Sequence, residues 1–333
     1  MLKSVQFKNY KALEDAELPL GRFTLLVGPN GSGKTTALTA IAAARKGNGN
    51  FDDLLTARHR DCPDTQVVVK LHWGNPYEGA FWRTVWTEGN RTQVESNPTQ
   101  PTGASREYLA AQLDGIRIFS LQANSIAAPV ALQPHVELNG QGAGLAGVLD
   151  RLRDHELERY DDLNRELGDW LPEFDRIAFD VPSKGIRSFS LRTRDSGHKI
   201  AATDLSHGTL FALALLTLSY LPDPPPIVCL EDPDQGIHPR LLRRVQDAIY
   251  RLAYPENFDD KRDPVQVIAT THSPYFLDLF KDHPEEVVIA EKTQHGVQFQ
   301  RLSDLPNVSE ILADAPLGHV WYTGILGGVP TGS

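Results

Sequence analysis

The chain has 333 residues, of which 41% are hydrophobic, so it can bury one large α/β core or two smaller ones. Its 33 basic and 43 acidic residues give a formal net charge of −10, which argues against direct nucleic-acid binding except through a local basic face or a partner. The two cysteines, Cys62 and Cys229, lie far apart and indicate neither a disulfide framework nor a zinc site.

The N-terminus also excludes some classes of protein. The opening MLKSVQFKNYKALEDAEL is charged where a secretory signal needs an apolar core. No apolar run approaches the roughly 20 residues that a membrane-spanning helix requires. We therefore expect a folded protein of the reducing cytoplasm, without membrane segments.

The first strong motif is FTLLVGPNGSGKTTALTAIAAA, which begins at Phe23. Its apolar start predicts a buried strand over 23–27, and its Ala- and Leu-rich end predicts a helix over 35–44. The loop between them has the pattern G-x-x-x-x-G-K-[ST], in the strand-loop-helix context that phosphate binding requires. The matching residues are Gly28, Gly33, Lys34 and Thr35.

Each of these residue types has a physical role in holding a nucleotide. Glycines let backbone N–H groups converge on phosphate oxygens, and the helix N-terminus adds its partial positive charge. We expect Lys34 to reach the β and γ phosphates of ATP and the Thr35 hydroxyl to ligate Mg²⁺. The alternative is a glycine-rich turn that matches the motif by chance. The strand predicted before the loop and the helix predicted after it disfavour that alternative.

A second apolar run, IVCL at 227–230, leads directly into Glu231 and Asp232. A buried strand that ends in carboxylates beside the phosphate loop would supply an acid for the metal and a second acid for the attacking water. The alternative is a solvent-exposed turn in which Asp-Pro only ends the strand. The upstream loop favours the functional interpretation.

Two further segments carry candidate site residues. A short β-rich run, 265–269, precedes Thr-Thr-His, so His272 could hydrogen-bond a γ-phosphate or a catalytic water; a structural histidine explains it equally well. LSHG precedes a strongly apolar helix, and Ser206 is placed to cap it. Such a helix N-terminus can bind anions, although a plain cap is the simpler reading of Ser206.

Taken in order, the phosphate loop, LSHG, EDPDQGIHP and the strand-end His272 resemble the nucleotide-binding domain of the ABC ATPase superfamily, and more closely its soluble RecF/SMC/OLD branch. The resemblance implies an α/β fold of the P-loop NTPase type, two-lobed, with a mixed sheet, a β-rich N-terminal subdomain and a short helical insertion. Many predicted bacterial ATPases of this branch are thought to act in phage defence or DNA maintenance.

Carried over to this chain, the resemblance implies a homodimer that sandwiches two ATP molecules. One subunit would hold the phosphates while Ser206 and Gly208 of the other close over the γ-phosphate. Gln122, in FSLQANS, resembles the glutamine that joins the two lobes and touches Mg²⁺ together with Thr35 and Glu231. The nucleotide-binding residues of the loop would be Gly28, Asn30, Gly31, Ser32, Gly33, Lys34, Thr35 and Thr36.

The chain departs from the superfamily pattern at the acids. The usual order is Asp then Glu, whereas here Glu231 takes the metal position and Asp232 the catalytic one. Asp is one methylene shorter than Glu, and displacements near 1 Å can cost on the order of 100-fold in rate. We therefore expect slow ATP turnover, and hydrolysis should fail in Asp232→Asn while ATP binding survives.

These placements predict one ABC-type domain over 1–333, divided into 1–100 with the phosphate loop, 101–205 with the insertion and second lobe, and 206–333 with the remaining motifs. VVVKLHW and AFWRTVWTEG predict strands, and 144–171 predicts one or two amphipathic helices. ESNPTQPTGASRE predicts a loop.

A basic stretch, SKGIRSFSLRTRDSGHK, predicts a strand pair with a solvated face; the alternative is an edge that faces DNA or a partner. Its basic residues are Lys184, Arg187, Arg192, Arg194 and Lys199. The apolar tail HVWYTGILGGVP would pack on its own core, or else dock a partner.

Two functions remain open from the sequence. The chain is either an ATP-hydrolysing regulatory subunit or a nucleotide-gated scaffold with little hydrolysis; a transporter motor is a weaker third option. No Toprim nuclease segment follows the motifs, so we expect any nuclease or other effector, and any contact with nucleic acid, to come through a separate partner.

Overall fold

The computed structural model describes residues 1–57, 65–89, 91–97, 105–133, 135–294, 296–306, 308, 310, 312 and 315–326. It divides the chain into two compact units, each built from segments far apart in sequence. Unit 1 comprises the described residues of Met1–Ile118, Pro225–Leu230 and Val265–Ser333. Unit 2 comprises those of Phe119–Pro224 and Glu231–Pro264.

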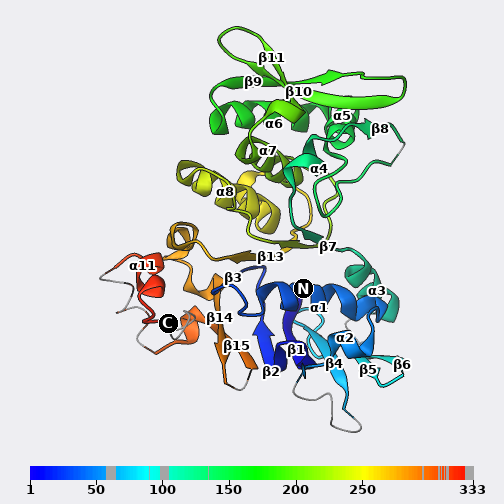
Figure 1. The fold of residues 1–333 in the computed structure, drawn as a ribbon, viewed down its shortest axis with the longest axis vertical. Helices are drawn as coiled ribbons and strands as arrows, with labels where there is room; N and C mark the ends of the chain where they lie inside the picture. Colours follow the sequence, from blue (N-terminus) through cyan, green and yellow to red (C-terminus); the bar gives the residue numbers. More distant parts are fainter. Residues whose placement is uncertain are drawn as a thin grey trace. The chain divides into compact units, whose positions relative to one another are not determined.

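A six-stranded mixed sheet has the order β15-β14-β3-β13-β12-β7 (Figure 1). Its central strands β3, β13 and β12 are parallel and wholly buried, which explains why their sequences are nearly continuous apolar runs. The strands are β3 (Phe23–Val27), β7 (Ile116–Phe119), β12 (Ile227–Leu230), β13 (Gln266–Thr271), β14 (Val287–Thr293) and β15 (Gly296–Arg301).

The N-terminal half of unit 1 forms a second, antiparallel sheet of order β2-β1-β4-β5-β6. Buried and half-buried residues alternate along VVVKLHW, as expected of a strand with one face on the core. The predicted β-rich subdomain is confirmed. Its strands are β1 (Leu2–Tyr10), β2 (Leu13–Pro19), β4 (Val67–Trp73), β5 (Phe81–Thr87) and β6 (Arg91–Asn97).

Helix α1 (Lys34–Lys46) packs its apolar stripe on this core and ends at Gly47, whose left-handed φ of 60° suits glycine. Two indole N–H groups, from Trp82 and Trp86, donate to the carbonyls of Ala44 and Gly47 at 3.1 and 2.8 Å. These bonds satisfy carbonyls that a helix end leaves without partners. The other helices of unit 1 within the described residues are α2 (Phe51–Leu54), α3 (Arg106–Asp114), α9 (Pro274–Leu277), α11 (Leu317–Tyr322), η5 (Asp278–Phe280), η6 (Pro284–Glu286) and η7 (Leu302–Asp304).

Unit 2 packs helices against a small antiparallel sheet in which β10 pairs with β8, β9 and β11. Its strands are β8 (Val130–Ala131), β9 (Phe174–Asp180), β10 (Ile186–Thr193) and β11 (Lys199–Ala201). Its helices are α4 (Ala123–Ala127), α5 (Leu145–His155), α6 (Leu157–Trp170), η2 (Ala202–Asp204), α7 (His207–Ser219), η3 (Pro239–Leu241), α8 (Leu242–Ala253) and η4 (Pro255–Phe258).

A buried ionic cluster ties α6 to the chain after η4. Asp260 accepts two hydrogen bonds from Arg159, at 2.9 and 3.0 Å, and lies 3.4 Å from the guanidinium of Arg262. Arg262 in turn donates to the carbonyls of Leu221 and Arg251 at 2.9 and 2.7 Å. Burial lowers the pKa of Arg262 to about 10, so this cation depends on its anionic neighbour.

The model confirms the predicted fold class, with its mixed sheet and β-rich N-terminal subdomain, and the segment 144–171 forms the two helices α5 and α6. The loop expected over 95–107 is wrong at its ends: residues 95–97 belong to β6 and residues 106 and 107 to α3, because Ser105 caps that helix by accepting from Tyr108 N. Residues 98–104 and Cys62 lie outside the described residues, and Cys229 is buried.

The start of the predicted apolar tail packs on its own unit. The N–H of Gly318, in α11, donates to Asp278 Oδ1 at 2.6 Å, and a Cβ at Gly318 would meet the carbonyl oxygen of Pro274 at 2.1 Å. Within the tail, Val320 and Trp321 are 2% and 6% exposed and so pack on their own unit, whereas Tyr322 and Ile325 are 73% and 64% exposed. No helix among the described residues is long and apolar enough to cross a membrane.

Candidate nucleotide-binding site

The glycine-rich loop lies between β3 and α1 in unit 1, where backbone packing dictates its glycines. A Cβ at Gly28 would lie 2.5 Å from the carbonyl oxygen of Ala290 and 2.7 Å from Ser32 Oγ, so no side chain fits there. Gly31 and Gly33 have φ values of 79° and 88°, in the left-handed region that favours glycine. The loop conformation therefore favours glycine at these three positions.

Lys34 is buried although it is charged. Its Nζ donates to the carbonyls of Gly28 and Pro29 at 2.6 and 3.0 Å, which holds the ammonium inside the turn of the loop. Asn30, Gly31 and Thr35 are exposed, and Thr36 is half-buried. The loop thus presents a fixed cation together with an accessible Thr35 hydroxyl.

The start of α1 offers backbone donors. Its N-cap residue is Gly33, which supplies no side-chain hydrogen bond to the first turn. The N–H groups of Lys34, Thr35 and Thr36 therefore have no partner inside the helix, and the helix dipole favours an anion at this end. This arrangement is the backbone geometry expected of a phosphate site.

A buried, unpartnered hydroxyl lies in the same loop. Ser32 Oγ is inaccessible to solvent and makes no hydrogen bond to any described residue. An orphaned buried oxygen is costly, and a phosphate or a hydrated cation at the loop would satisfy it. The residues present therefore fit a magnesium nucleotide.

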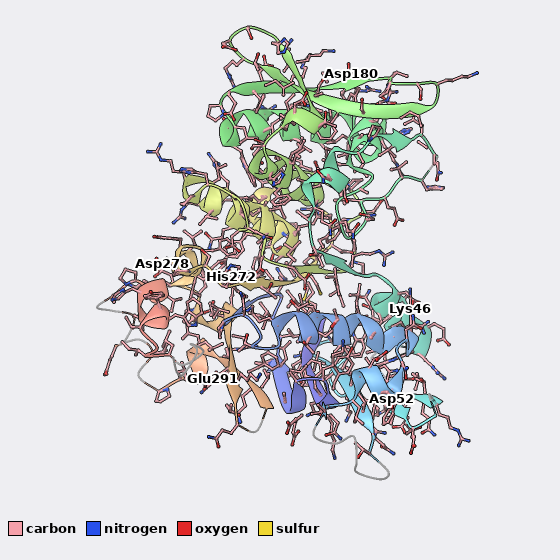
Figure 2. All side chains as sticks on the ribbon, viewed as in Figure 1. Lys46, Asp52, Asp180, His272, Asp278 and Glu291 are labelled. Atoms are coloured by element: carbon pink, nitrogen blue, oxygen red, sulfur yellow. The ribbon has the colours of Figure 1, made fainter. Side chains whose placement is uncertain are left out.

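His272 follows the end of β13, next to β3. The parallel register pairs Thr271 with Val27, so the loop after β3 and the residue after β13 begin at the same edge of the sheet. His272 is exposed, and Ser273 caps α9 by accepting from Phe276 N at 3.3 Å. Figure 2 labels His272 at this position. Unit 1 thus brings the histidine to the sheet edge that carries the loop.

The two acids follow β12 but belong to unit 2. Glu231 N donates to Phe119 O at 2.9 Å, and the buried Glu231 Oε1 has no hydrogen-bond partner in the described chain. Asp232 has a φ of 43°, unusual for a non-glycine residue. Its carbonyl accepts from Gln235 N at 2.9 Å, which closes a turn. We call residues 231–237 the acid turn.

An unpartnered carboxylate oxygen on Glu231 is what a metal-binding role requires. Among the described residues, no group of three or more His, Cys, Asp or Glu side chains is arranged to hold an ion by itself. Mg²⁺ usually keeps several waters and binds through one or two protein oxygens plus substrate phosphates, so such a cluster is not needed.

Ser206 and Gly208 lie at the N-terminus of α7 in unit 2. Ser206 is exposed, and its Oγ accepts from Thr209 N at 3.1 Å, so it is the helix cap that the sequence predicts. The helix is buried along most of its length, which fixes that exposed end. Gly208 packs against the acid turn, where a Cβ would lie 2.6 Å from the carbonyl oxygen of Gly236. The sequence did not reveal this contact.

Gln122 is exposed and precedes α4, without using its side chain as a cap. Its N–H donates to Gln141 O at 3.0 Å. It lies three residues after Phe119, whose carbonyl binds the backbone of Glu231. The metal role expected of Gln122 stays a prediction.

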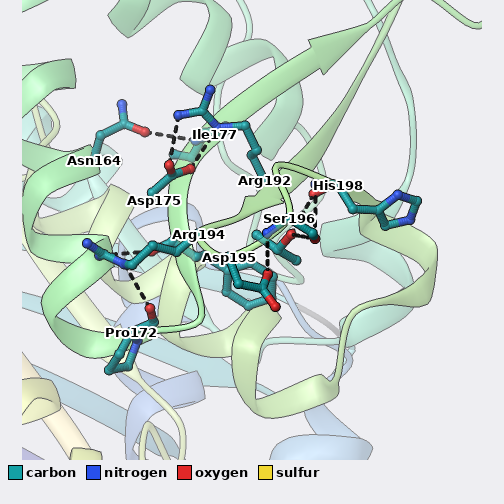
Figure 3. Close-up of polar contacts among 11 residues, drawn as sticks. Asn164, Pro172, Asp175, Ile177, Arg192, Arg194, Asp195, Ser196 and His198 are labelled. Carbon is teal, nitrogen blue, oxygen red and sulfur yellow. Dashed lines mark hydrogen bonds and ion pairs between the residues drawn. The ribbon is translucent and has the colours of Figure 1, made fainter.

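The basic stretch forms β10 and β11, as predicted, but most of its cations are paired (Figure 3). Arg192 donates twice to Asp175, both at 2.8 Å, and Arg194 donates to the carbonyls of Pro172 and Phe174. Arg187 lies 3.1 Å from the buried Asp150. These bonds favour a structural role over a surface that binds DNA.

The predicted site residues therefore fall into two groups. Unit 1 holds the phosphate loop and His272, whereas unit 2 holds Gln122, Ser206, Gly208 and both acids. The sequence analysis did not single out Gly236, although a glycine shortly after the two acids in EDPDQGIHP can indicate a special backbone conformation.

Family models match two parts of the chain. The model described as "AAA ATPase domain" matches residues 1–68, which contain the phosphate loop. The model described as "AAA domain, putative AbiEii toxin, Type IV TA system" matches residues 137–278, which contain the signature residues, the acids and His272.

Among curated proteins, an OLD nuclease of Thermus scotoductus is 24% identical over 354 residues, which cover 87% of this chain. The chain spans 64% of the length of that relative. Two solved SMC heads share the fold. One, bound to the C-terminal winged-helix domain of ScpA, has a TM-score of 0.65, 14% identity and coverage of 90% of this chain and 97% of that chain.

The second SMC head, bound to the C-terminal domain of ScpA derived from Pyrococcus furiosus, has a TM-score of 0.62 and 14% identity, and covers 94% of this chain and 99% of that chain. At these identities the SMC heads show the fold alone, while the family models and the OLD nuclease match the sequence. Family models of AAA-type ATPase domains thus match both parts of the chain that carry its motifs, the sequence is similar to an OLD nuclease over most of the chain, and the fold is similar to that of the SMC heads.

Proposed function

We propose that the protein binds Mg·ATP at the loop 28–36 and hydrolyses it slowly, and that the nucleotide controls its self-association. The observation that carries the proposal is the loop itself, in which the buried Lys34 ammonium, the start of α1 without a side-chain cap and the unpartnered Ser32 hydroxyl belong to one turn between β3 and α1. Backbone donors and a fixed cation converge on phosphates in this arrangement.

The remaining residues act on the nucleotide in defined ways. Thr35, Glu231 and Gln122 would hold Mg²⁺ through their side-chain oxygens, and the ion when bound would neutralise charge on the phosphates. Asp232 accepts a proton from the attacking water and orients it. His272 donates a hydrogen bond to the γ-phosphate. The order of the acids and the left-handed backbone of Asp232 are the reasons to expect slow turnover.

Ser206 and Gly208 would complete the nucleotide site of a second copy. Both lie at the exposed end of an otherwise buried helix, whose N-terminus attracts phosphate. A site divided between subunits forms only when ATP joins them, so that nucleotide state sets association state. We propose a homodimer with two ATP molecules at its interface.

The dimer would control an effector that acts on nucleic acid, in DNA maintenance or phage defence. The name of the OLD nuclease supports an effector of the nuclease class. The paired cations of β10 make direct DNA binding through that strand unfavourable, which supports nucleic-acid contact through the effector. Purification of the native complex followed by mass spectrometry would identify the effector.

The proposal is tested with two variants. Lys34→Ala should lose binding of a fluorescent ATP analogue, whereas Asp232→Asn should retain binding, stay dimeric with ATP and lose phosphate release. Thermal unfolding of both variants controls for folding. ATP binding by Lys34→Ala at the affinity of the parent protein would refute the proposed site.

The acid turn also favours a second function. If Asp232 cannot reach the water, the protein is a nucleotide-gated scaffold in which ATP binding alone drives assembly. Steady-state phosphate release, with and without DNA and with Asp232→Asn as the blank, separates the two functions. Release above the blank supports the ATPase, and dimerisation without release supports the scaffold.

A further inference from the structure

The N-terminus of α7 touches the acid turn through two glycines, and this contact lies wholly within unit 2. A Cβ at Gly208 would lie 2.6 Å from the carbonyl oxygen of Gly236 and 3.6 Å from its carbonyl carbon. On the other side, a Cβ at Gly236 would lie 3.6 Å from two ring carbons of Phe211. The contact is therefore backbone against backbone, with no space for a side chain on Gly208.

The acid turn is braced along its length. Gln235 N donates to Asp232 O at 2.9 Å, and Ile237 N donates to Asp234 O at 3.3 Å. The turn begins at Glu231, whose N–H donates to Phe119 O, and it ends at Ile237, which is buried. A shift of Gly236 therefore acts on Asp232 through a short hydrogen-bonded segment.

We infer that Gly208 and Gly236 are positioning residues, through which the start of α7 sets the place of Asp232 in its own chain. The inference rests on the proposed function, in which that helix end binds the nucleotide of the second copy. The ATP held in the partner's loop would contact the start of α7. Through Gly208 and Gly236, this contact would align Asp232, which acts on the ATP held in the loop of its own chain. The two sites of the dimer are coupled through this contact.

The size of the effect follows from the geometry. Ordinary contacts of a Cβ begin at 3.4 Å, so Gly208→Ala must separate the two backbones by about 0.8 Å, the difference between 3.4 and 2.6 Å. Misplacement of a catalytic group by about 1 Å can reduce the rate on the order of 100-fold. Alanine normally stabilises a helix relative to glycine, so a loss would come from the contact and not from helix propensity.

Hydrogen exchange tests the contact without nucleotide. In Gly208→Ala the Gln235 amide should exchange on the order of tenfold faster than in the parent protein, because its bond to Asp232 O loosens. The matched control is Gly74→Ala, since a Cβ there lies at least 3.5 Å from the nearest atoms, all in the Lys3 side chain. Unchanged exchange in Gly208→Ala, with thermal unfolding confirming a folded protein, would overturn the inference whatever the ATPase activity is.

Mixed dimers separate this role from the contact that Gly208 makes with the partner's nucleotide. One subunit carries Gly208→Ala, and the other carries Lys34→Ala and so binds no ATP. The remaining ATP then lies in the loop of the first subunit and is completed by the unaltered α7 of the second. We expect kcat to fall about 100-fold, with KM unchanged, relative to the dimer of parent and Lys34→Ala.

Equal kcat in the two mixed dimers would refute the positioning of Asp232 by Gly208 of the same chain. If the parent homodimer releases no phosphate, the proposed hydrolysis fails, and the exchange measurement alone decides the inference. If the parent homodimer is active and only the control mixed dimer is inactive, ATP in the partner's loop is required, as the coupling expects. Gly236→Ala provides a second variant, because its φ of 70° strains any residue but glycine and so perturbs the turn from the other side of the contact. It should show the same fast exchange at Gln235, and slow exchange there would contradict the inference.

Discussion

Removal of the Asp260 carboxylate should destabilise the protein more than removal of any exposed acid. The Asp260 side chain is 8% exposed, and its two cationic neighbours, Arg159 and Arg262, are 27% and 5% exposed. Asp260→Ala would leave both guanidinium groups without this anion, and Arg262 is too deeply buried to be hydrated. Removing one member of a buried pair typically costs about 3–5 kcal/mol.

The lower end of that range applies because Arg159 can rehydrate. A loss of about 3 kcal/mol corresponds to a decrease in Tm of roughly 4 °C for a chain of 333 residues, because the entropy of unfolding is about 2.1 cal/mol/K per residue. The matched control is Asp162→Ala, which removes an exposed partner of Arg165 at 2.8 Å and should cost less than about 1 kcal/mol. Urea unfolding and calorimetry measure both variants.

The pH dependence of the same variant provides an independent check. Burial alone would raise the pKa of Asp260, but hydrogen bonds from Arg159 and the charge of Arg262 outweigh it and hold the pKa below its usual value of 3.8. The unfolded chain thus binds this proton more readily, so the stabilisation is present above pH 3.8 and disappears as the pH falls through the folded-state pKa. The difference in stability between parent and Asp260→Ala should shrink over that range. Equal losses in Asp260→Ala and Asp162→Ala at neutral pH would refute the reasoning.

Three further predictions concern the site and its surroundings. Gly28→Ala should abolish ATP binding, measured by fluorescence titration, because its Cβ would collide with the Ala290 carbonyl; retained affinity would contradict the geometry of the loop. Ser206→Ala should cost about 1 kcal/mol from the lost cap, and Ser206→Asn should restore stability but not phosphate release if the hydroxyl also contacts nucleotide. Arg192→Gln should leave any duplex affinity and its salt dependence unchanged in anisotropy measurements, because Asp175 already occupies its guanidinium, whereas a tenfold loss would assign this strand to DNA binding.

The sequence predicts well those elements whose conformation is determined by residues close together in the chain. The strand before the phosphate loop, the loop and α1 follow from an apolar run, two special glycines and an Ala-rich helix, all within 24 residues of sequence from Phe23 to Lys46. The Ser206 cap was equally visible, because a cap needs only the residue and the helix that follows it.

Features formed by residues distant in sequence were not predictable. In the sequence, Gly208 and Gly236 each indicate at most a local backbone conformation, and neither motif shows that the two glycines are in contact. The same holds for Arg159 and Asp260, because an isolated charge in sequence carries no sign of the partner that permits its burial. Division of the chain into units also depends on packing, and β12 and the acids that follow it fall on different sides of the boundary.

That boundary bears on the choice between an ATPase and a scaffold. The residues proposed to hold the nucleotide belong to unit 1, whereas Asp232 belongs to the acid turn of unit 2, which is braced by α7. Binding therefore needs only the local geometry of the loop, while hydrolysis also needs the acid turn in its place. If the dimer sets that place through α7, hydrolysis requires the partner even though binding does not. A monomeric variant should then bind ATP normally and release no phosphate, whereas equal rates in monomer and dimer would leave α7 no part in catalysis.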